Sequence, residues 1–410
     1  MTHIKYLVNL NLGGIKLGLQ KTRKLLAACN NPEKKIRSIQ IVGTNGKGSI
    51  AGMICNAFVS QNYKVGLFTS PHLVKINERI QINFRQIEDH QMKKFINRYK
   101  KSIDEIEASF FEVLTVMALW HFSKKKVDFA ILETGLGGRL DSVTACKSEG
   151  VIFASISKDH EHILGNNLKQ ITREKAGAIT AKTKYLLSGN QKHQIKEGLK
   201  QVAKKHNKQV KFINGNIFKY KKDSFLYLKG QHQIYNGNIA YYSSIETAKH
   251  FNLEVYGEKI KKNILNTFWP GRMQTIQNKP KIIFDVCHNA DGVQACFDYM
   301  MDILTQYKTK YLIVAFENKK QIKKSLYHLV ELFDYVTITE TKIRNSMDAI
   351  NLTRELNLDH VAANQSIINA LSTNVRRLLS NDILLIIGSH FIGPSISKKF
   401  KNCFANNKKV

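Results

Sequence analysis

The sequence predicts an α/β protein of two domains, in which a domain built on a mainly parallel sheet precedes a smaller α/β domain. A chain of 410 residues is longer than one hydrophobic core usually serves. Short apolar runs alternate with longer helical patterns along most of it, and a glycine-rich turn separates one such run from a helix-compatible segment. With 43% hydrophobic residues, the chain can fill two cores.

The first alternation runs from residue 36 to residue 188 and predicts parallel strands joined by helical crossovers. In such sheets, ligands bind at the carboxyl ends of the strands. The expected strands are 39–42, 65–69, 129–132, 151–156 and 185–187, and the expected helices lie near 48–61, 88–100, 109–123 and 167–180. The segment 190–265 has weaker periodicity and short strand candidates such as 224–228, so we interpret it as the tail of the first domain.

A second alternation begins after Trp269-Pro270-Gly271 and Pro280, where two prolines and a glycine interrupt the chain. It predicts a Rossmann-like α/β domain, and we place the domains at 1–268 and 269–410. The expected strands are 282–286, 311–315, 335–339 and 383–387, and the expected helices lie near 291–305, 319–333 and 364–379.

The glycine-rich turn reads Gly-Thr-Asn-Gly-Lys-Gly-Ser over residues 43–49. Glycines allow backbone N–H groups to approach phosphate oxygens, Lys47 adds a positive charge, and Ser49 offers a hydroxyl to a magnesium ion. The common P-loop has four residues in its spacer and a Ser or Thr directly after its lysine. Here the spacer has two residues, and Gly48 follows Lys47. A turn that binds nothing is the alternative, and the strand and helix around it favour phosphate binding.

The formal net charge of +31 raises the possibility of a nucleic-acid-binding protein. The lysines are dispersed in short runs without interleaved aromatic residues, which favours a solvated basic surface and no nucleic-acid partner. The sequence contains no long apolar run and no apolar stretch near Met1, so we expect a cytoplasmic protein that does not bind membranes. Its six cysteines form no Cys-x-x-Cys pair, and reduced thiols are expected.

Polar side chains follow three further strands of the predicted first sheet. Ser70 follows the second strand, Glu133 begins a Glu-Thr-Gly-Leu-Gly-Gly-Arg-Leu-Asp turn after the third, and His160 follows the fourth. Hydroxyl and carboxylate oxygens are the ligands that Mg²⁺ prefers. The sequence therefore predicts that Ser49, Ser70 and Glu133 hold this ion at one sheet edge.

These motifs together resemble those of folylpolyglutamate synthases and bifunctional dihydrofolate synthases, which belong to the Mur ligase superfamily of ATP-dependent amide ligases. The unusual glycine loop and the turn after Glu133 are the most specific of the matches. They occur in the family's order over most of the chain, at 43–49, 70–73, 77–80, 110–112, 133–141, 159–160, 174–177, 232–233 with Asn236, 269–272 and 285–289.

The resemblance implies an ATP site and one or two magnesium ions, with a second domain that closes over the nucleotide. The implied ATP contacts are Asn45, Gly46, Lys47, Gly48, Ser49, Asn236, Arg272, Asp285 and His288. One ion would be held by Ser49, Ser70 and Glu133, and the second by Glu133, His160 and a carbamylated Lys175. Lys47, His160 and Lys175 are the implied catalytic residues. Without the resemblance, Lys175 reads as a surface lysine and His288 as a strand-end histidine satisfied by its neighbours.

The resemblance also places a pterin-bearing substrate on three segments, formed by Leu17, Gly18, Ser109, Phe110, Phe111, Glu112, Leu140, Asp141 and Ser142. An aromatic pair beside a carboxylate suits a flat heteroaromatic ring, although a helix-buried phenylalanine pair is an equally simple interpretation. The implied reaction joins L-glutamate to dihydropteroate, to a reduced folate, or to both, through an acyl phosphate formed with ATP. We expect a bifunctional enzyme that acts as a monomer.

The segment 315–320 departs from the family pattern, because Ala-Phe-Glu-Asn-Lys replaces a glycine-containing Asp-Lys-Asp sequence. Ala290 and the run 144–146 depart from it as well. Three alternative functions remain: folylpolyglutamate synthesis alone, a peptidoglycan-precursor ligase, and a nucleic-acid-stimulated ATPase. The Lys47-Gly48-Ser49 order and the Ser-Pro-His-Leu segment at 70–73 argue against the peptidoglycan ligase.

Overall fold

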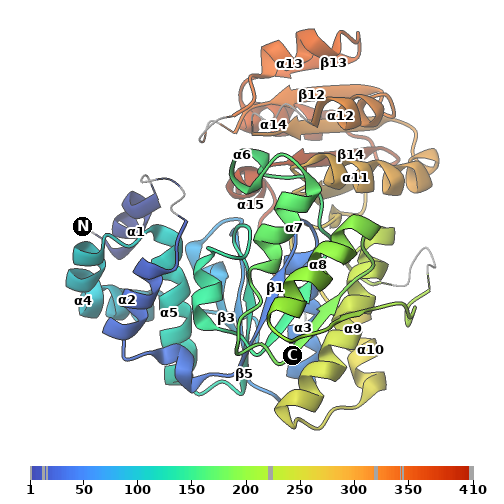
Figure 1. The fold of residues 1–410 in the computed structure, drawn as a ribbon. Helices are drawn as coiled ribbons and strands as arrows, with labels where there is room; N and C mark the ends of the chain where they lie inside the picture. The colour runs from blue at the N-terminus through green and yellow to red at the C-terminus, as the bar shows by residue number, and fades with distance from the viewer. Residues whose placement is uncertain are drawn as a thin grey trace. The chain divides into compact units, whose positions relative to one another are not determined.

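The computed structural model describes residues 2–11, 14, 17–219, 225–317, 322–341, 343 and 346–405. The chain forms two compact units (Figure 1). The first contains residues 1–219 and 235–265, and the second contains residues 220–234 and 266–410. The expected domain boundary after residue 268 lies close to this division and stays a prediction, whereas the grouping of 220–234 with the second unit was not anticipated.

The sheet of the first unit has eight strands: β1 (Ser38–Val42), β2 (Val65–Phe68), β3 (Ile80–Ile82), β4 (Arg85–Gln86), β5 (Phe129–Glu133), β6 (Gly150–Phe153), β7 (Tyr185–Ser188) and β8 (Val210–Phe212). Their order is β4-β3-β2-β5-β1-β6-β7-β8. Six strands pair in parallel, in the spatial order β2, β5, β1, β6, β7 and β8. Strands β3 and β4 extend the sheet beyond β2 and are antiparallel to their neighbours. The central strands are buried on both faces, which explains their nearly continuous apolar sequences.

The helices of this unit are α1 (His3–Asn11), α2 (Gln20–Ala28), α3 (Lys47–Val59), α4 (Asp89–Ile106), α5 (Phe110–Lys125), α6 (Glu161–Leu164), α7 (Leu168–Ala176), α8 (His193–Lys205), α9 (Gln231–Phe251) and α10 (Gly257–Leu265). Figure 1 shows α1, α2, α4 and α5 packed together, and they share one core with β2 and β5. A second core joins β6 and β7 to α7 and α8. Helix α3 is buried on most sides and packs against β1, β2, β5 and α10.

The second unit is built on six strands: β9 (Gln274–Gln277), β10 (Lys281–Asp285), β11 (Lys310–Ala315), β12 (Tyr335–Thr339), β13 (Val361–Asn364) and β14 (Ile383–Gly388). Their order is β13-β12-β11-β14-β10-β9, with β9 alone antiparallel. The described helices that cover the sheet are α11 (Ala290–Ile303), α12 (Lys323–Val330), α13 (Ala349–Leu356), α14 (Ile367–Arg377) and α15 (Gly393–Lys399). The predicted α/β fold class, with a mainly parallel sheet domain followed by a smaller α/β domain, is therefore confirmed.

Most of the segment 190–265 belongs to the first unit, but the prediction of a short strand at 224–228 was wrong. The segment contains two long helices, α8 and α9, together with β8 and α10. No strand forms over residues 225–228, and residue 224 of that expected strand lies outside the described residues. Phe225 and Leu228 are buried as anchors of an irregular turn, in which Lys229 Nζ donates a hydrogen bond to the Phe225 carbonyl at 2.9 Å. The apolar pattern there reflects burial without a neighbouring strand to pair with.

Two other expectations reach residues without a described structure. The predicted helix at 319–333 is described as α12, and its residues 319–321 lie outside the described part of the chain. Residues 318–320 of the divergent segment lie outside it as well. Among the described residues, no helix is both long enough and apolar enough to cross a membrane.

Gly388, the last residue of β14, is the tightest point of the second sheet. Its φ is +139°, and a Cβ atom built on it would lie 1.9 Å from the carbonyl oxygen of Ala315 on the adjacent strand. We expect Gly388→Ala to destabilise the protein by about 2 kcal/mol or more, because backbone atoms would have to separate. Urea unfolding checks this. Gly257→Ala is the control, because its Cβ would meet only the Tyr241 hydroxyl, at 3.0 Å, and a cost as large there would contradict the explanation.

Candidate active site

The glycine loop lies between β1 and α3, as the sequence predicted. Gly46 is the N-cap of α3 with φ +85°, so it has no side chain to accept hydrogen bonds from the first turn of the helix. Those N–H groups and the helix dipole favour an anion at this end. A Cβ on Gly46 would lie 2.4 Å from Oδ1 of the buried Asn236, so the structure places this predicted nucleotide contact directly beside the loop.

The loop is fixed to the end of β6 by a reciprocal pair of hydrogen bonds. Thr44 Oγ1 donates to the Ser157 carbonyl at 3.0 Å and accepts from the Ser157 N–H at 3.0 Å. The Thr44 N–H also donates to the Ser155 carbonyl at 2.7 Å. A Cβ on Gly43 would lie 2.8 Å from the Ala154 Cβ, so glycine is needed for this close approach. The glycine loop is therefore held against a neighbouring strand end.

Two lysine amines converge on the carbonyl of Gly43. Lys47 Nζ donates to Gly43 O at 3.2 Å and to Thr44 O at 3.0 Å, and Lys175 Nζ donates to Gly43 O at 2.8 Å. Lys175 is buried, so its interpretation as a surface lysine was wrong: α7 turns this residue inward, under the loop. Burial, and secondarily the charge of Lys47, lower the pKa of Lys175 to about 7, against the opposing effect of Asp159.

The turn after β5 presents the predicted acidic ligand beside the loop. Glu133 pairs with Ile41 of β1 in the parallel register and is buried. Its Oε2 accepts the Ser70 N–H at 3.0 Å, so the two predicted magnesium ligands are adjacent. Ser49, in the first turn of α3, is also buried. A buried carboxylate with hydroxyls at neighbouring strand and helix ends is a hard-oxygen donor set, which fits Mg²⁺.

The same turn docks against the end of α7. A Cβ on Gly138 would lie 2.4 Å from the Lys175 carbonyl oxygen, and the Arg139 N–H donates to the Glu174 carbonyl at 2.8 Å. Arg139 also forms an ion pair with the Glu174 carboxylate at 3.0 Å. These contacts fix the segment that carries Lys175 beside the segment that begins at Glu133.

His160 lies after β6, in the connection to α6, and has a left-handed backbone with φ 50°. Its side chain is one-third exposed, with Nε2 3.9 Å from Asp159 Oδ1, and its ring lies 6.1 Å from that of His162. Asp159 was part of the recognised motif but received no role in the sequence analysis. Its electrostatic effect on Lys175 places this carboxylate close to the buried amine.

The three segments predicted to bind the pterin-bearing substrate are linked to one another. The Gly18 N–H donates to the Leu140 carbonyl at 3.1 Å. The buried Thr22 hydroxyl donates to Ser142 Oγ at 3.1 Å and to Glu112 Oε1 at 3.5 Å. Thr22 therefore connects residues from two of the segments, and the sequence analysis missed it because nothing distinguishes a threonine in a helical pattern.

Within these segments, several predicted contacts already have structural roles. Ser109 and Glu112 form the capping box of α5, in which Glu112 Oε2 accepts the Ser109 N–H at 2.7 Å. Phe110 is buried, with the Arg79 guanidinium 5.2 Å from its ring centre. Phe111 is only partly buried, and its ring fills the space beside Gly135, where a Cβ would lie 2.5 Å from Cζ.

Asp141 is the other buried carboxylate of this region. It accepts the N–H groups of Leu136 at 2.8 Å and Val143 at 3.0 Å, and burial raises its pKa to about 6. The positive charge of Lys47 opposes this rise, so the phosphate loop and the substrate segments are close enough to interact electrostatically. Leu17, by contrast, is 40% exposed.

In the second unit, Arg272, Asp285 and His288 lie near the carboxyl end of β10. The two oxygens of the buried Asp285 accept the N–H groups of Met273 and Cys287, both at 2.7 Å. Burial raises the pKa of Asp285, and the Arg272 charge opposes this. His288 lies 5.4 Å from His390, measured between ring centres. The sequence analysis missed His390, although it follows β14, the strand beside β10, so strand-end reasoning could have found it.

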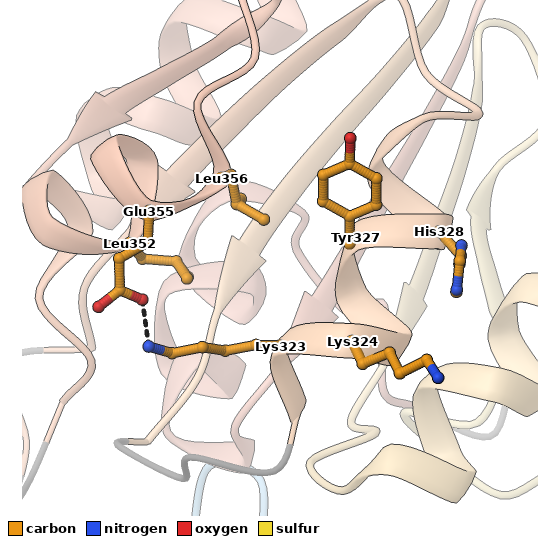
Figure 2. Close-up of a pocket in the computed structure, with 7 residues that line it drawn as sticks. All are labelled: Lys323, Lys324, Tyr327, His328, Leu352, Glu355 and Leu356. Atoms are coloured by element: carbon orange, nitrogen blue, oxygen red, sulfur yellow. Dashed lines mark ion pairs between the residues drawn. The ribbon is translucent and has the colours of Figure 1, made fainter.

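A groove of about 320 Å³ lies elsewhere in the second unit, between α12 and α13. Figure 2 shows Tyr327 between an ion pair of Lys323 with Glu355 on one side and the Lys324 and His328 side chains on the other. None of the predicted site residues lines this groove. The predicted chemistry belongs to the strand ends described above.

Comparisons with known proteins agree with these motifs. Residues 271–390 match the Mur ligase, glutamate ligase domain family. The chain is 28% identical to the Bacillus subtilis dihydrofolate synthase/folylpolyglutamate synthase over 95% of its length and 96% of the relative's. The Mycobacterium tuberculosis folylpolyglutamate synthase complexed with ADP has the same fold, with a TM-score of 0.87 and 22% identity over 97% of this chain and 99% of that one.

The Buchnera aphidicola (subspecies Schizaphis graminum) dihydrofolate synthase/folylpolyglutamate synthase is 30% identical, over 85% of this chain and 84% of its own length. Its similarity therefore extends through both compact units, as do the motifs from the glycine loop to the strand ends of the second sheet. The chain belongs to the dihydrofolate synthase/folylpolyglutamate synthase family.

Proposed function

We propose that this protein is an ATP-dependent ligase that joins L-glutamate to dihydropteroate and to folates, and that releases ADP and phosphate. One observation carries the proposal: a glycine loop, two convergent lysines and a buried carboxylate lie at one sheet edge, and the charge of Lys47 acts on Asp141 of the segments expected to bind the pterin. The names of the two bacterial relatives support the same substrates. Folylpolyglutamate synthesis alone is the second candidate.

The glycine loop would bind the ATP phosphates through the N–H groups of residues 45–49, with Lys47 as the neutralising charge. Its position suits this role, because Nζ already lies over the loop, on the carbonyls of Gly43 and Thr44. A phosphate oxygen would be a stronger acceptor than either carbonyl. Asn236, beside Gly46, is proposed as a nucleotide contact, and so are Arg272, Asp285 and His288 of the second unit.

Two magnesium sites are proposed on this edge. Ser49, Ser70 and Glu133 would hold one ion, and Glu133, His160 and a carbamylated Lys175 the other. Bound Mg²⁺ would neutralise charge on the phosphate oxygens. The protein's own part is to supply anionic and hydroxyl oxygens in a fixed arrangement, which the hydrogen bond between Glu133 and the Ser70 backbone supports.

Carbamylation of Lys175 is consistent with its surroundings. A buried amine whose pKa is lowered to about 7 is about half uncharged at neutral pH, and the uncharged amine is the nucleophile that attacks CO₂. The attack forms one N–C bond, breaks one C=O π bond of CO₂ and releases one proton, so the uncharged amine becomes a carbamate with anionic oxygen atoms. The neighbouring Lys47 disfavours the ammonium form of Lys175 and favours this anion.

The reaction would proceed in two steps. The substrate carboxylate attacks the γ-phosphorus of ATP, and ADP leaves as an acyl phosphate forms. The amine of glutamate then attacks the activated carbonyl, and phosphate leaves. No protein nucleophile is needed, because positioning and electrostatic stabilisation supply the rate enhancement. Thr22 would position the acceptor segments, since it links Glu112 with Ser142.

The proposed activity is tested by incubating the purified protein with ATP, Mg²⁺ and L-glutamate, and with either dihydropteroate or tetrahydrofolate. We expect products heavier by one glutamyl residue from both acceptors, with one ADP per addition, measured by mass spectrometry and coupled ADP detection. Addition to tetrahydrofolate alone would support the second candidate. ATP hydrolysis that rises with DNA or RNA and ignores glutamate would contradict both and favour the ATPase suggested by the net charge.

Lys47→Met should lower kcat by about 100-fold or more, because one of the charges that stabilise the transferring phosphoryl group is lost. The half-buried side chain donates hydrogen bonds to the loop carbonyls of Gly43 and Thr44, so circular dichroism should show an intact fold. Lys200→Met is the matched control, since this lysine pairs with Glu197 on an exposed helix face and should leave the rate unchanged. An unchanged rate in Lys47→Met would refute the phosphate role.

Lys175 should carry a carbamate when the protein is equilibrated with ¹³C-bicarbonate, giving a carbamate resonance by ¹³C NMR. The signal should grow as pH rises through about 7, because the amine becomes uncharged there. Lys175→Gln should lose both the resonance and ligase turnover. Lys184→Gln alters an exposed ion pair with Glu149 and should keep both. A wild-type protein that is active without the resonance would contradict carbamylation.

A further inference from the structure

A cluster of metal-binding side chains lies buried in the second unit, and the proposed reaction leaves its sulfur atoms without a role. A carboxylate oxygen of Asp285 and the Sγ atoms of Cys287 and Cys296 all lie within 4.8 Å of one another. The Sδ atom of Met273 lies 3.5 Å from the Cys296 Sγ. We propose that Met273, Asp285, Cys287 and Cys296 form a binding site for one thiophilic divalent cation of the Zn²⁺ or Cd²⁺ type.

The fold brings the two thiols together through the start of α11. Asn289 is the N-cap of this helix, and its side chain accepts the Gly292 N–H at 2.9 Å. A Cβ on Gly292 would lie 3.0 Å from the Cys287 Cβ, so glycine allows the first turn of the helix to pack against the strand end. Cys296 lies four residues after Gly292, on the same helix face, and therefore points toward Cys287.

Met273 is brought to the cluster by its backbone. It has φ 41°, in the left-handed region that bulky residues rarely occupy, and its N–H donates to Asp285 Oδ2 at 2.7 Å. Asp285 thus fixes the residue whose thioether contacts Cys296. Each oxygen of Asp285 accepts one backbone N–H, from Met273 or from Cys287, so each retains a lone pair that can face an ion.

The dimensions suit a four-coordinate ion. Zinc binds sulfur at about 2.3 Å, so two sulfur ligands on one tetrahedral ion lie about 3.8 Å apart. Met273 Sδ and Cys296 Sγ lie 3.5 Å apart, which is close to that spacing. The ligand atoms of Asp285, Cys287 and Cys296 lie within 4.8 Å of one another, so small shifts would bring them onto one ion. Two thiols, a thioether and one carboxylate favour a thiophilic ion over Mg²⁺, which prefers oxygen ligands.

Charge selects a divalent ion. Two thiolates and the Asp285 carboxylate carry three negative charges, and the nearby Arg272 guanidinium contributes one positive charge. A divalent cation together with Arg272 brings the buried group to neutrality, whereas a monovalent ion leaves one uncompensated charge. Binding would form two metal–thiolate bonds, one metal–thioether bond and one metal–oxygen bond, and would release two thiol protons to solvent with no change of oxidation state.

A disulfide is the competing use of a close thiol pair. Both thiol side chains are almost fully buried, which slows their reaction with oxidants in solution. A disulfide would use only the sulfur atoms of Cys287 and Cys296, whereas a cation would also use the Met273 thioether and the Asp285 carboxylate. The composition of the cluster therefore favours metal binding over oxidation.

The test titrates the full-length, fully reduced and chelator-treated protein with Cd²⁺ and follows the ultraviolet charge-transfer band of cadmium thiolates. We expect one Cd²⁺ per chain. Cys287→Ser and Cys296→Ala should each weaken binding by about tenfold or more, because each removes a ligand. Met273→Leu, which keeps the volume of the side chain, should weaken it less. Cys55→Ala is the matched control, because this buried thiol lies in α3 of the first unit.

Thermal unfolding of each variant identifies any that do not fold, and Cys287→Ser and Cys296→Ala test the same site independently. The proposal would be overturned if the wild-type protein gave no saturable band, or if both folded cysteine variants bound Cd²⁺ as tightly as the wild-type protein. It would also be overturned if the protein were two hydrogens lighter and neither thiol reacted with a thiol reagent, which would identify a disulfide. The assay uses neither ATP nor folate, so its result is independent of the proposed function.

Discussion

The carbonyl oxygen of Gly43 is the point on which the first unit's chemistry depends. Two lysine amines, from α3 and α7, donate hydrogen bonds to this one atom. Their mutual repulsion, added to burial, lowers the pKa of Lys175 to about 7. The glycine loop therefore brings an amine that is about half uncharged at neutral pH to an edge that carries buried carboxylates. In the proposed mechanism, Lys47 would neutralise phosphate charge and Lys175 would become a metal ligand.

A network of buried polar contacts holds this edge together. Gln40, in the middle of β1, donates to the hydroxyls of Thr134 and Thr144 at 2.9 Å each, and Thr144 donates to the Gly138 carbonyl at 2.7 Å. The glycine turn after β5 is thus connected to the strand that carries the phosphate loop. Apart from the Gln40 Oε1 atom, which has no partner among the described residues, these buried polar groups are hydrogen-bonded and favour one arrangement. Functional residues from separate strands consequently keep fixed positions, which preorganisation requires.

The central strands were predictable because parallel strands buried on both faces have continuous apolar sequences. The edge strands β8, β9 and β13 were missed, since they are short and partly exposed. The clustering of the loop with Glu133 followed from topology. The burial of Lys175 could not be foreseen, because a lysine in a polar helix face gives no sign of the carbonyl below it. Thr22 could not be foreseen either, because a threonine in a helical pattern gives no sign of its buried partners. His390 was overlooked, although it follows the end of a strand.

The hydrogen bonds that fix Thr44 to the end of β6 affect how the sequence around the loop can change in evolution. Their partners are main-chain atoms of Ser155 and Ser157, and the two lysines likewise donate hydrogen bonds to main-chain oxygens. Every amino acid except proline carries both the N–H and the carbonyl, so most substitutions at these positions would keep the hydrogen bonds. A lineage can therefore drift to 28% identity with a relative while the architecture around its loop persists. The backbone hydrogen bonds, more than the identities of the neighbouring side chains, hold the loop in place.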